Sequence, residues 1–323
     1  MTSVAFLFPG QGSQRPGMGR DLAERFPELV ERYYRPADDL LGLPLSTLCW
    51  EGSAEELQRT DITQPAVFLT SLVALDVLRA HGISPALAAG HSLGEYAALV
   101  CAGVLDWRDA LQLVRRRGEL MAKVNENNPG AMAALIGLSL ERSEELCTEA
   151  RERGGGVVEI ANDNEPGQQV VSGTVDTVRL VMAGAKEAGA TKVVQLAVGA
   201  PFHCSLMAGM EEEFAAELDA VEFRDPAIPV LANVTADEVR TGAEARERLR
   251  RQLADRVRWT DTLRRIGTYG VTGLTEVGPG RVLAGFSRAV LPEIPHHAAG
   301  EWRRLRATIG ALNESPPENG YKI

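Results

Sequence analysis

The sequence Gly-His-Ser-Leu-Gly at residues 90–94 separates a short apolar run from a helical one. Residues 85–89 predict a buried strand, and residues 95–102 predict a helix that stops at Gly103. Glycines on both sides of Ser92 allow a tight turn that exposes its hydroxyl, and the N–H groups that open the helix can bind developing negative charge. The pattern predicts a serine nucleophile on an α/β scaffold. The alternative is a strand–helix connection whose glycines serve packing only.

Composition and charge narrow the class of protein. The chain has 323 residues and 45% hydrophobic content, enough for a large core in one domain or in a large domain with an insert. Aromatic residues make up only 5%, which suits helices packed on a parallel sheet. The formal net charge of −10 argues against a nucleic-acid partner.

The cysteines and the apolar segments bear on compartment and metal content. None of the four cysteines forms a C-x-x-C pair or a His/Cys cluster with zinc spacing, so we expect no metal site and a reduced, cytoplasmic protein. Residues 4–9 lack a basic leader and predict a first strand rather than a signal peptide. We expect no apolar stretch long enough to span a bilayer, and therefore no membrane association.

The middle of the chain has a distinct pattern of predicted strands and helices. Strands are predicted over residues 131–137, 157–162, 169–172 and 192–198, with helices over 140–153 and 175–188. This β-α-β-β-α-β order is typical of a ferredoxin-like subdomain, and turn-rich joints lie at both of its ends. We therefore predict a discontinuous large domain over 1–127 and 199–313, a small subdomain over 128–198, and a disordered tail over 314–323.

The predicted large domain alternates short strands with helices. Pro65 is expected in the first turn of the longest helix, and His296 and His297 in a late surface loop. Strands are predicted over 4–8, 230–233 and 273–277, and helices over 21–34, 54–60, 63–80, 106–125, 206–221, 243–255 and 260–267.

A serine nucleophile needs a base, and the chain offers five histidines. His91 adjoins Ser92 and should point away from it at a sharp turn. His203 follows Pro-Phe in the loop where the large domain resumes, which is a suitable place for a base. From the pattern alone, any of these histidines could equally be structural.

Arg117 lies in the middle of the apolar face of the helix that begins near Trp107. A buried, unpaired guanidinium costs about 3–5 kcal/mol, so this one needs an anion. Two interpretations stay open at this point. One is a buried ion pair with an Asp or Glu, and the other is a bidentate clamp on a substrate carboxylate.

Gln11 lies where a glycine-rich loop leaves the first strand. Backbone N–H groups there could complete an oxyanion hole, or the loop could be an ordinary turn. It is not a phosphate-binding P-loop, because no Gly-Lys-Ser/Thr follows.

Six sequence blocks together resemble the malonyl-CoA:acyl carrier protein transacylases, including free-standing acyltransferases that serve polyketide synthases. The resemblance implies an α/β-hydrolase-like large domain with a short parallel sheet and a ferredoxin-like insert. It implies no permanently bound cofactor, malonyl-CoA as substrate, and the phosphopantetheine thiol of an acyl carrier protein, acting in trans, as acceptor. The blocks are FPGQGSQ at 8–14, GHSLGE at 90–95, RG at 117–118, PFHC at 201–204, RQL at 251–253 and EVGPG at 276–280.

The resemblance also implies roles for single residues. Phe202 stands where many housekeeping members have a serine before the base, and its bulky ring would crowd an α-methyl group and favour malonyl over methylmalonyl. The remaining implied roles are Ser92 as nucleophile, His203 as base and then acid held by a backbone carbonyl, the N–H groups of Gln11 and Leu93 as oxyanion hole, Arg117 as carboxylate ligand, Gln252 near the base and Asn162 at the pocket edge.

Two other functions are compatible with parts of the pattern. A carrier-protein acyl hydrolase or an esterase could use the same Ser-His dyad, and His297 could be a late esterase histidine, although Arg117 and the Gln11 loop would then be unexplained. A non-enzymatic scaffold is disfavoured by the intact Ser92, His203 and Arg117.

The pathway, fatty acid or polyketide, stays open, and we expect a monomer. The chain contains no carrier segment of its own. A carrier protein is typically acidic, so its docking would need a local basic patch. The candidate patch is the group of four arginines Arg246, Arg248, Arg250 and Arg251, joined by Arg264 and Arg265. Its alternative is a solvated helix face paired with Glu244 and Glu247.

Overall fold

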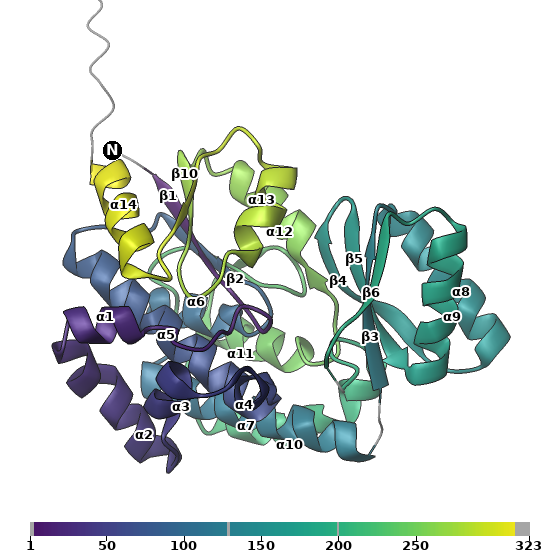
Figure 1. Cartoon of the computed structure of the whole chain (residues 1–323), viewed down its shortest axis with the longest axis horizontal. Helices are drawn as coiled ribbons and strands as arrows, with labels where there is room; N and C mark the ends of the chain where they lie inside the picture. The colour runs from purple at the N-terminus through teal and green to yellow at the C-terminus, as the bar shows by residue number, and fades with distance from the viewer. Residues whose placement is uncertain (1–2, 128–129, 199, 314–323) are drawn as a thin grey trace, which may run out of the picture.

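The computed structural model describes residues 3–127, 130–198 and 200–313, without the side chains of 125–127. This part of the chain forms an α/β fold with two mixed sheets, one of six strands and one of five (Figure 1). The predicted domain boundaries adjoin residues 128–129 and 199, which lie outside the described ranges, and they stay predictions. The predicted disordered tail over 314–323 also lies outside them.

The six-stranded sheet has the order β11-β10-β1-β2-β7-β8 and is parallel except for β8. Alternate residues of its central strand β1 face two different cores, one formed with α5 and one with α12 and α13. The carboxyl ends of β1 and β2 meet at one edge, which is where ligands bind in open α/β sheets. The strands are β1 Val4–Phe8, β2 Leu87–Gly90, β7 Val230–Leu231, β8 Glu238–Val239, β10 Gly273–Glu276 and β11 His296–Ala298.

Helices cover both faces of this sheet (Figure 1). Most lie where the sequence predicts a helix, with ends shifted by a few residues. They are α1 Arg20–Arg25, the π-helix Val30–Tyr34, α2 Arg35–Leu41, α3 Leu45–Glu51, α4 Ala54–Gln58, α5 Thr60–Ala80, α6 Gly94–Cys101, α7 Trp107–Asn127, the 3-10 helix Ser205–Met210, α10 Glu211–Asp219, α11 Gly242–Arg251, α12 Trp259–Gly267, α13 Val282–Val290 and α14 Trp302–Asn313.

Helix α5 corrects two expectations. It begins at Thr60, so Pro65 lies inside the helix rather than in its first turn. The helix has 21 residues and contains an 18-residue window with a mean hydropathy of 1.4, so it is long and apolar enough to cross a membrane, contrary to the prediction. However, 89% of that apolar window is buried inside the protein, so the helix is apolar because it is central to the core. In the polar turn before Pro65, the Thr63 hydroxyl donates to the backbone carbonyls of Leu57 and Arg59.

Three further predictions about secondary structure are wrong. The helix predicted over 21–34 breaks near Pro27, which lacks a backbone N–H, and resumes as a π-helix. The helix predicted over 206–221 begins as a 3-10 helix. His296 and His297 lie on strand β11 rather than in a surface loop, because β11 pairs with β10. Three residues directly after Pro295 are too few to give a strand pattern.

The five-stranded sheet has the order β6-β3-β5-β4-β9 and is antiparallel except for the β4–β9 pair. Helices α8 and α9 pack on one face of it through a core of Leu, Val and Ala side chains. The order of its first four strands and two helices along the chain agrees with the predicted one. The elements are β3 Gly130–Ile136, α8 Leu140–Gly154, β4 Val158–Glu165, β5 Gln168–Thr174, α9 Val175–Glu187, β6 Lys192–Gln195 and β9 Val257–Arg258.

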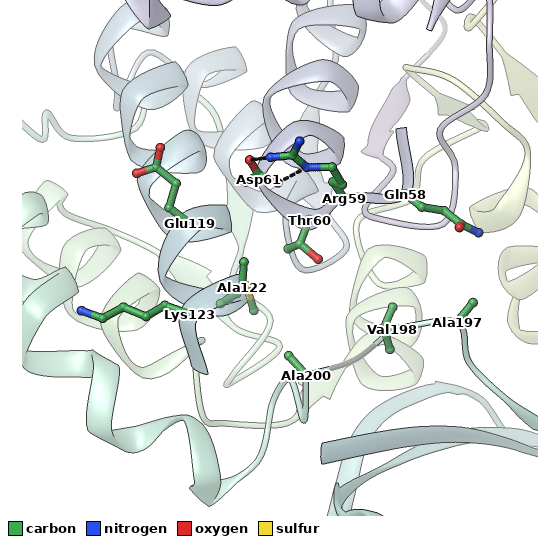
Figure 2. A pocket seen from close by; sticks show the side chains of 11 residues that line it. Gln58, Arg59, Thr60, Asp61, Glu119, Ala122, Lys123, Ala197, Val198 and Ala200 are labelled. Carbon is green, nitrogen blue, oxygen red and sulfur yellow. Dashed lines mark hydrogen bonds and ion pairs between the residues drawn. The ribbon is translucent and has the colours of Figure 1, made fainter. Parts of the chain in front are cut away.

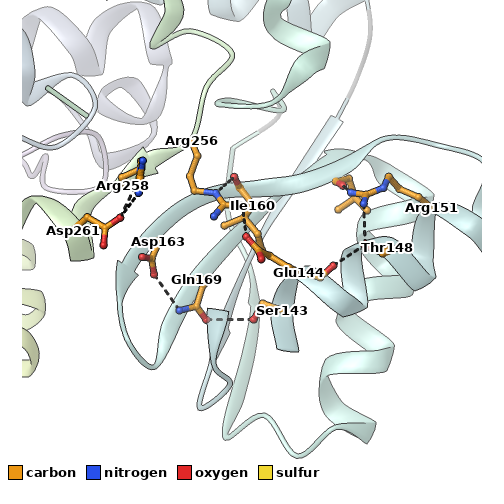
Figure 3. A network of polar contacts seen from close by, with 11 residues as sticks. Ser143, Glu144, Thr148, Arg151, Ile160, Asp163, Gln169, Arg256, Arg258 and Asp261 are labelled. Carbon is orange, nitrogen blue, oxygen red and sulfur yellow. Dashed lines mark hydrogen bonds and ion pairs between the residues drawn. The ribbon is translucent and has the colours of Figure 1, made fainter. Parts of the chain in front are cut away.

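Strand β9, which the sequence did not indicate, fastens the segment after α11 to this second sheet (Figure 3). The Arg256 guanidinium lies 2.7 Å from Glu144 of α8. The Thr260 hydroxyl donates to the Asp163 carbonyl over 3.2 Å. These contacts hold the chain that follows Gln252, so they help to fix Gln252 beside the turn that carries Ser92.

Candidate active site

The turn between β2 and α6 is a strained elbow. Ser92 has φ of 49°, a left-handed conformation that non-glycine residues rarely adopt. A Cβ on Gly90 would lie 2.0 Å from the Gly94 carbonyl group, and one on Gly94 would lie 2.0 Å from the Phe8 carbonyl oxygen. Both glycines are therefore required for this close approach, which agrees with the predicted strand–turn–helix.

Ser92 and His203 form a hydrogen-bonded pair. The serine Oγ lies 2.7 Å from His203 Nε2, and His203 Nδ1 lies 2.8 Å from the backbone carbonyl oxygen of Gln252. Burial, assisted by the charge of Arg117, lowers the pKa of His203 to about 3. The ring is therefore neutral near pH 7. With Nδ1–H donating to the carbonyl, the Nε2 lone pair faces the serine hydroxyl.

No other histidine of the described residues hydrogen-bonds to the Ser92 side chain. His91 points away from Ser92, as expected: its Nε2 lies 2.8 Å from Asn164 Oδ1, and its ring packs edge-on against Trp259. Burial lowers the pKa of His91. His297 borders a separate cavity between α13 and α14, so the structure does not bring it to Ser92 as the esterase alternative would need.

Arg117 is buried, with 1% of its surface exposed, and its hydrogen-bond partners are neutral. Its Nη1 donates to Gln64 Oε1 over 2.8 Å, and its Nη2 donates to Ser92 Oγ over 3.0 Å and to Gln252 Oε1 over 3.1 Å. No carboxylate of the described residues lies within ion-pairing distance of it. The structural alternative of a buried ion pair is therefore wrong, and the guanidinium can still accept an anion.

Gln252 connects these groups. Its backbone carbonyl holds His203, and its side-chain Oε1 accepts from Arg117. Its Nε2 donates to the Ser92 carbonyl over 3.1 Å and to Glu95 Oε2 over 2.6 Å. The orientation of its amide follows from these bonds, because only Oε1 can accept from the guanidinium.

The sequence analysis did not single out Glu95, Asn233 or Gln64. Glu95 Oε2 accepts from Gln252 Nε2 and also from the backbone N–H of Asn233, over 3.1 Å. The Asn233 side chain bridges the elbow, since Oδ1 accepts from the Ser92 N–H over 2.6 Å and Nδ2 donates to the Gly90 carbonyl over 2.6 Å. In the sequence, Glu95 is marked only as the acidic residue after the Gly-His-Ser-Leu-Gly turn, and Asn233 only as a polar residue just beyond a strand.

A cavity of about 100 Å³ lies in front of Ser92. Gln11, Asn162 and Phe202 line it, and the roles that the resemblance implies for them stay predictions. Gln252 does not line it but lies fully buried behind it, and Leu93 begins the turn into α6. The complete lining is Gln11, Gln64, His91, Ser92, Arg117, Met121, Met132, Asn162, Leu196, Val198, Phe202 and His203.

A larger cavity of about 610 Å³ adjoins this one and shares Met121 and Val198 with it. Figure 2 shows its walls, with Arg59 paired to Asp61 on one side and Ala197, Val198 and Ala200 on the other. The residues that the structure describes include no group of three His, Cys, Asp or Glu side chains that could hold a metal ion.

The burial of Glu95 generates a prediction about stability. Burial raises the pKa of Glu95 to about 7. At pH values between the ordinary pKa of a glutamate and about 7, Glu95 is ionised in the unfolded chain but still largely protonated in the folded protein. The contribution of Glu95 to the free energy of unfolding therefore falls as the pH rises through this range. Glu95→Gln keeps an oxygen for both hydrogen bonds and removes this dependence. We expect the difference in unfolding free energy, variant minus parent, to increase by about 1–3 kcal/mol between about pH 5 and about pH 8.

Urea denaturation at both pH values measures this difference. Glu55→Gln, at an exposed position on α4, is the matched control and should give a difference that does not change with pH. A Glu95→Gln difference that is equally flat would contradict the account of Glu95.

Comparison with known proteins identifies the family of the chain. A family model described as an acyl transferase domain matches residues 5–294. The malonyl CoA-acyl carrier protein transacylase of Bacillus subtilis strain 168 is 41% identical over 314 residues, which cover 97% of this chain and 98% of that protein. The protein of the same name from Escherichia coli O157:H7 is 42% identical over 310 residues, 96% of this chain and 99% of that protein.

Solved structures agree with these relatives. A malonyl-transacylase in complex with a type II polyketide synthase acyl-carrier protein has a TM-score of 0.92 at 40% identity, covering 96% of this chain and all of that one. An acyl carrier protein S-malonyltransferase from Vibrio cholerae has a TM-score of 0.90 at 40% identity, with 95% and 100% covered. This chain therefore belongs to the malonyl-CoA:acyl carrier protein transacylase family of acyltransferases.

Proposed function

We propose that the protein transfers a malonyl group from malonyl-CoA to the phosphopantetheine thiol of an acyl carrier protein, through an acyl-enzyme on Ser92. The observation that carries this proposal is the position of Arg117, whose buried guanidinium has no carboxylate partner among the described residues and donates to the Ser92 hydroxyl over 3.0 Å. A carboxylated acyl group on Ser92 would lie within reach of it. The names of the relatives support the same substrate and acceptor.

In the first half-reaction, Ser92 Oγ attacks the thioester carbonyl while His203 Nε2 accepts its proton. The tetrahedral intermediate collapses with loss of the coenzyme A thiolate, which takes the proton from His203. In the second half-reaction the carrier thiol gives its proton to Nε2 and its sulfur attacks the acyl carbonyl. Ser92 leaves as an alkoxide and recovers the proton, so the enzyme returns to its starting state.

The oxyanion of each intermediate is proposed to lie between the backbone N–H groups of Gln11 and Leu93. The N–H of Ser92 itself is not available, because it donates to Asn233 Oδ1. The N–H groups of Leu93 and Gln11 make no hydrogen bond to another described residue. Leu93 also lies at the N-terminus of α6, where the helix dipole favours negative charge.

The Gln64, Arg117 and Gln252 group is proposed to select for malonyl. A carboxylate would accept from Arg117 in a charge-assisted, bidentate pair and replace the weaker bond to the serine hydroxyl. An acetyl group would leave the guanidinium without an anion. Selection therefore comes from the cost of leaving a buried cation unpaired as much as from the bond that malonyl forms.

The 610 Å³ cavity is proposed to admit the pantetheine arm, since it opens next to the smaller cavity at Met121 and Val198. A long amide-bearing arm needs both polar and apolar walls. The Arg59–Asp61 pair and Lys123 supply the polar ones. The same opening would serve coenzyme A and the carrier protein in turn.

The four-arginine docking patch does not form as predicted. Arg248 is only 17% exposed and donates to the carbonyls of Asp237 and Glu238. Arg246 donates to the Val221 carbonyl. These two arginines stabilise loop backbone, because the helix places them against it. If the carrier docks here, the contacts fall to the exposed Arg250 and Arg251.

For the fold we propose an α/β-hydrolase-like large domain with a ferredoxin-like insert. The strand order β6-β3-β5-β4, which is 4-1-3-2 along the insert, supports the second assignment. The proposed chemistry uses only side chains and backbone N–H groups, so it needs no bound cofactor. We place the protein in the cytoplasm, and its four buried, unpaired cysteines are compatible with that.

Replacement of the nucleophile tests the acyl-enzyme. Intact-mass measurement after mixing with malonyl-CoA should find one malonyl adduct on the parent and none on Ser92→Ala. Ser205→Ala, at an exposed serine two residues beyond the base, should keep the adduct. Malonylation of Ser92→Ala followed by transfer would refute the assignment, and turnover of the parent to free malonate without transfer would favour the hydrolase.

Replacement of Arg117 tests substrate selection. Arg117→Ala should lower kcat/KM for malonyl-CoA by at least about 100-fold, because it removes charge-assisted bonds, and should raise the relative use of acetyl-CoA. Arg116→Ala is the matched control, since Arg116 is adjacent, has the same charge and pairs with Glu213 and Glu217 at the surface. An unchanged malonyl-to-acetyl preference in Arg117→Ala would contradict the clamp.

Phe202 is predicted to limit the α-substituent. Its side chain is 8% exposed and lines the cavity beside Ser92, where an α-methyl group would meet the ring. The parent should prefer malonyl over methylmalonyl, and Phe202→Ser should narrow that preference by about tenfold. Competition between the two thioesters measures the ratio, and equal use of both by the parent would disprove the role of the ring.

A further inference from the structure

A third cavity, of about 340 Å³, lies at the outer edge of the six-stranded sheet. Edge strand β11 forms its base, and helices α13 and α14 form its two sides. It shares no lining residue with the cavity in front of Ser92. Its lining is Arg281, Ala284, Arg288, His296, His297, Ala298, Arg304, Ala307, Thr308 and Ala311.

The cavity is basic in a chain whose net charge is −10. Arg281 and Arg288 lie seven residues apart, at the start and in the last turn of α13, and Arg304 faces them from α14. Two histidines lie between them, and no aspartate or glutamate is among the described residues of the lining. The three arginine charges therefore have no carboxylate in the described lining to balance them, so the cavity can accept an anion.

Two carboxylates near the cavity have partners of their own, and a third, Glu293, acts only electrostatically on His296. Glu276 accepts from the backbone N–H groups of Leu283 and Ala284 and so caps α13. Glu301 pairs with Arg15 and approaches Arg304 only to 4.0 Å. Glu276 acts on Arg281 only electrostatically, and neither Arg281 nor Arg288 forms an ion pair with a described residue.

The inner surface has space and unused donors. Four alanines, at positions 284, 298, 307 and 311, keep the hollow open between the two helices. His296 Nε2 is buried without a hydrogen-bond partner among the described residues. The N–H of Ala299 donates toward β10, so the alternation of a parallel strand turns the Ala298 N–H to the free edge. The Ala298 N–H can donate to an anion inside the arginine rim, and His296 Nε2 can do so when an anion holds the ring protonated, because the other ring nitrogen bonds to the Leu291 backbone.

We propose that this cavity binds a phosphorylated small molecule, with Arg281 and Arg288 on its phosphate groups and its uncharged part against the alanines. Arginine forks match phosphate oxygens bidentately, and the two α13 arginines with Arg304 surround the space from both helices. The site is separate from the proposed transfer reaction, so it concerns another ligand or a regulator of the same enzyme.

Isothermal titration with inorganic pyrophosphate tests the proposal. Saturable binding of one pyrophosphate is expected, weakened at least about tenfold in Arg281→Ala/Arg288→Ala. The control Arg303→Ala/Arg306→Ala removes the same charge from exposed α14 positions outside the cavity and should bind as the parent does. No saturable binding, or equal weakening in both variants, would overturn the site.

Two further readouts fix its place and its chemistry. In an NMR titration the ring signals of His296 and His297 should shift, whereas shifts confined to His91 and His203 would place the anion near Ser92 and overturn the proposal. Citrate, a polyanion without phosphate, should bind more weakly than pyrophosphate. Tighter binding of citrate would contradict the ligand class. Self-malonylation by malonyl-CoA should be unchanged in both double variants.

Discussion

The buried charge of Arg117 is the constraint on which the rest of the site depends. A guanidinium with 1% exposure and only neutral partners is costly to keep, and burial lowers its pKa. Its charge also helps to lower the pKa of His203, so the base stays neutral beside the serine. The protein thus holds a cation without a directly bonded carboxylate next to Ser92, the proposed nucleophile, and we propose that a substrate carboxylate completes this arrangement.

One network of hydrogen bonds fixes the positions of Ser92, His203 and Arg117 relative to one another. Gln252 orients both Arg117 and His203, and Glu95 and Asn233 hold Gln252 and the elbow from behind. These residues come from the ends of β7 and α11 and from the first turn of α6. Strand β9 and its contacts fasten the segment after α11 to the second sheet, so the small sheet contributes to the catalytic geometry as well as to the cavity wall.

The sequence predicted the residues that local pattern determines. Flanking glycines reveal Ser92, and helical periodicity turns Arg117 inward. The family blocks added His203, Gln11, Asn162 and Gln252. Glu95, Asn233 and Gln64 could not be found, because their roles depend on which strand and helix ends meet in space. Strand β11 is too short to give an alternating pattern. From the sequence, the arginines of α11 form a charged helix face, and only the structure shows that two of them bind loop carbonyls.

The central claim is that the Arg117 charge recognises the free carboxylate of the acyl group. The most direct measurement is the Kd of the non-acylating Ser92→Ala protein for malonyl-CoA and for its terminal methyl ester, which has the same chain but no charge. The account predicts that malonyl-CoA binds at least about tenfold more tightly, as expected for loss of a charge-assisted bond. Equal affinity for the acid and the ester would contradict it.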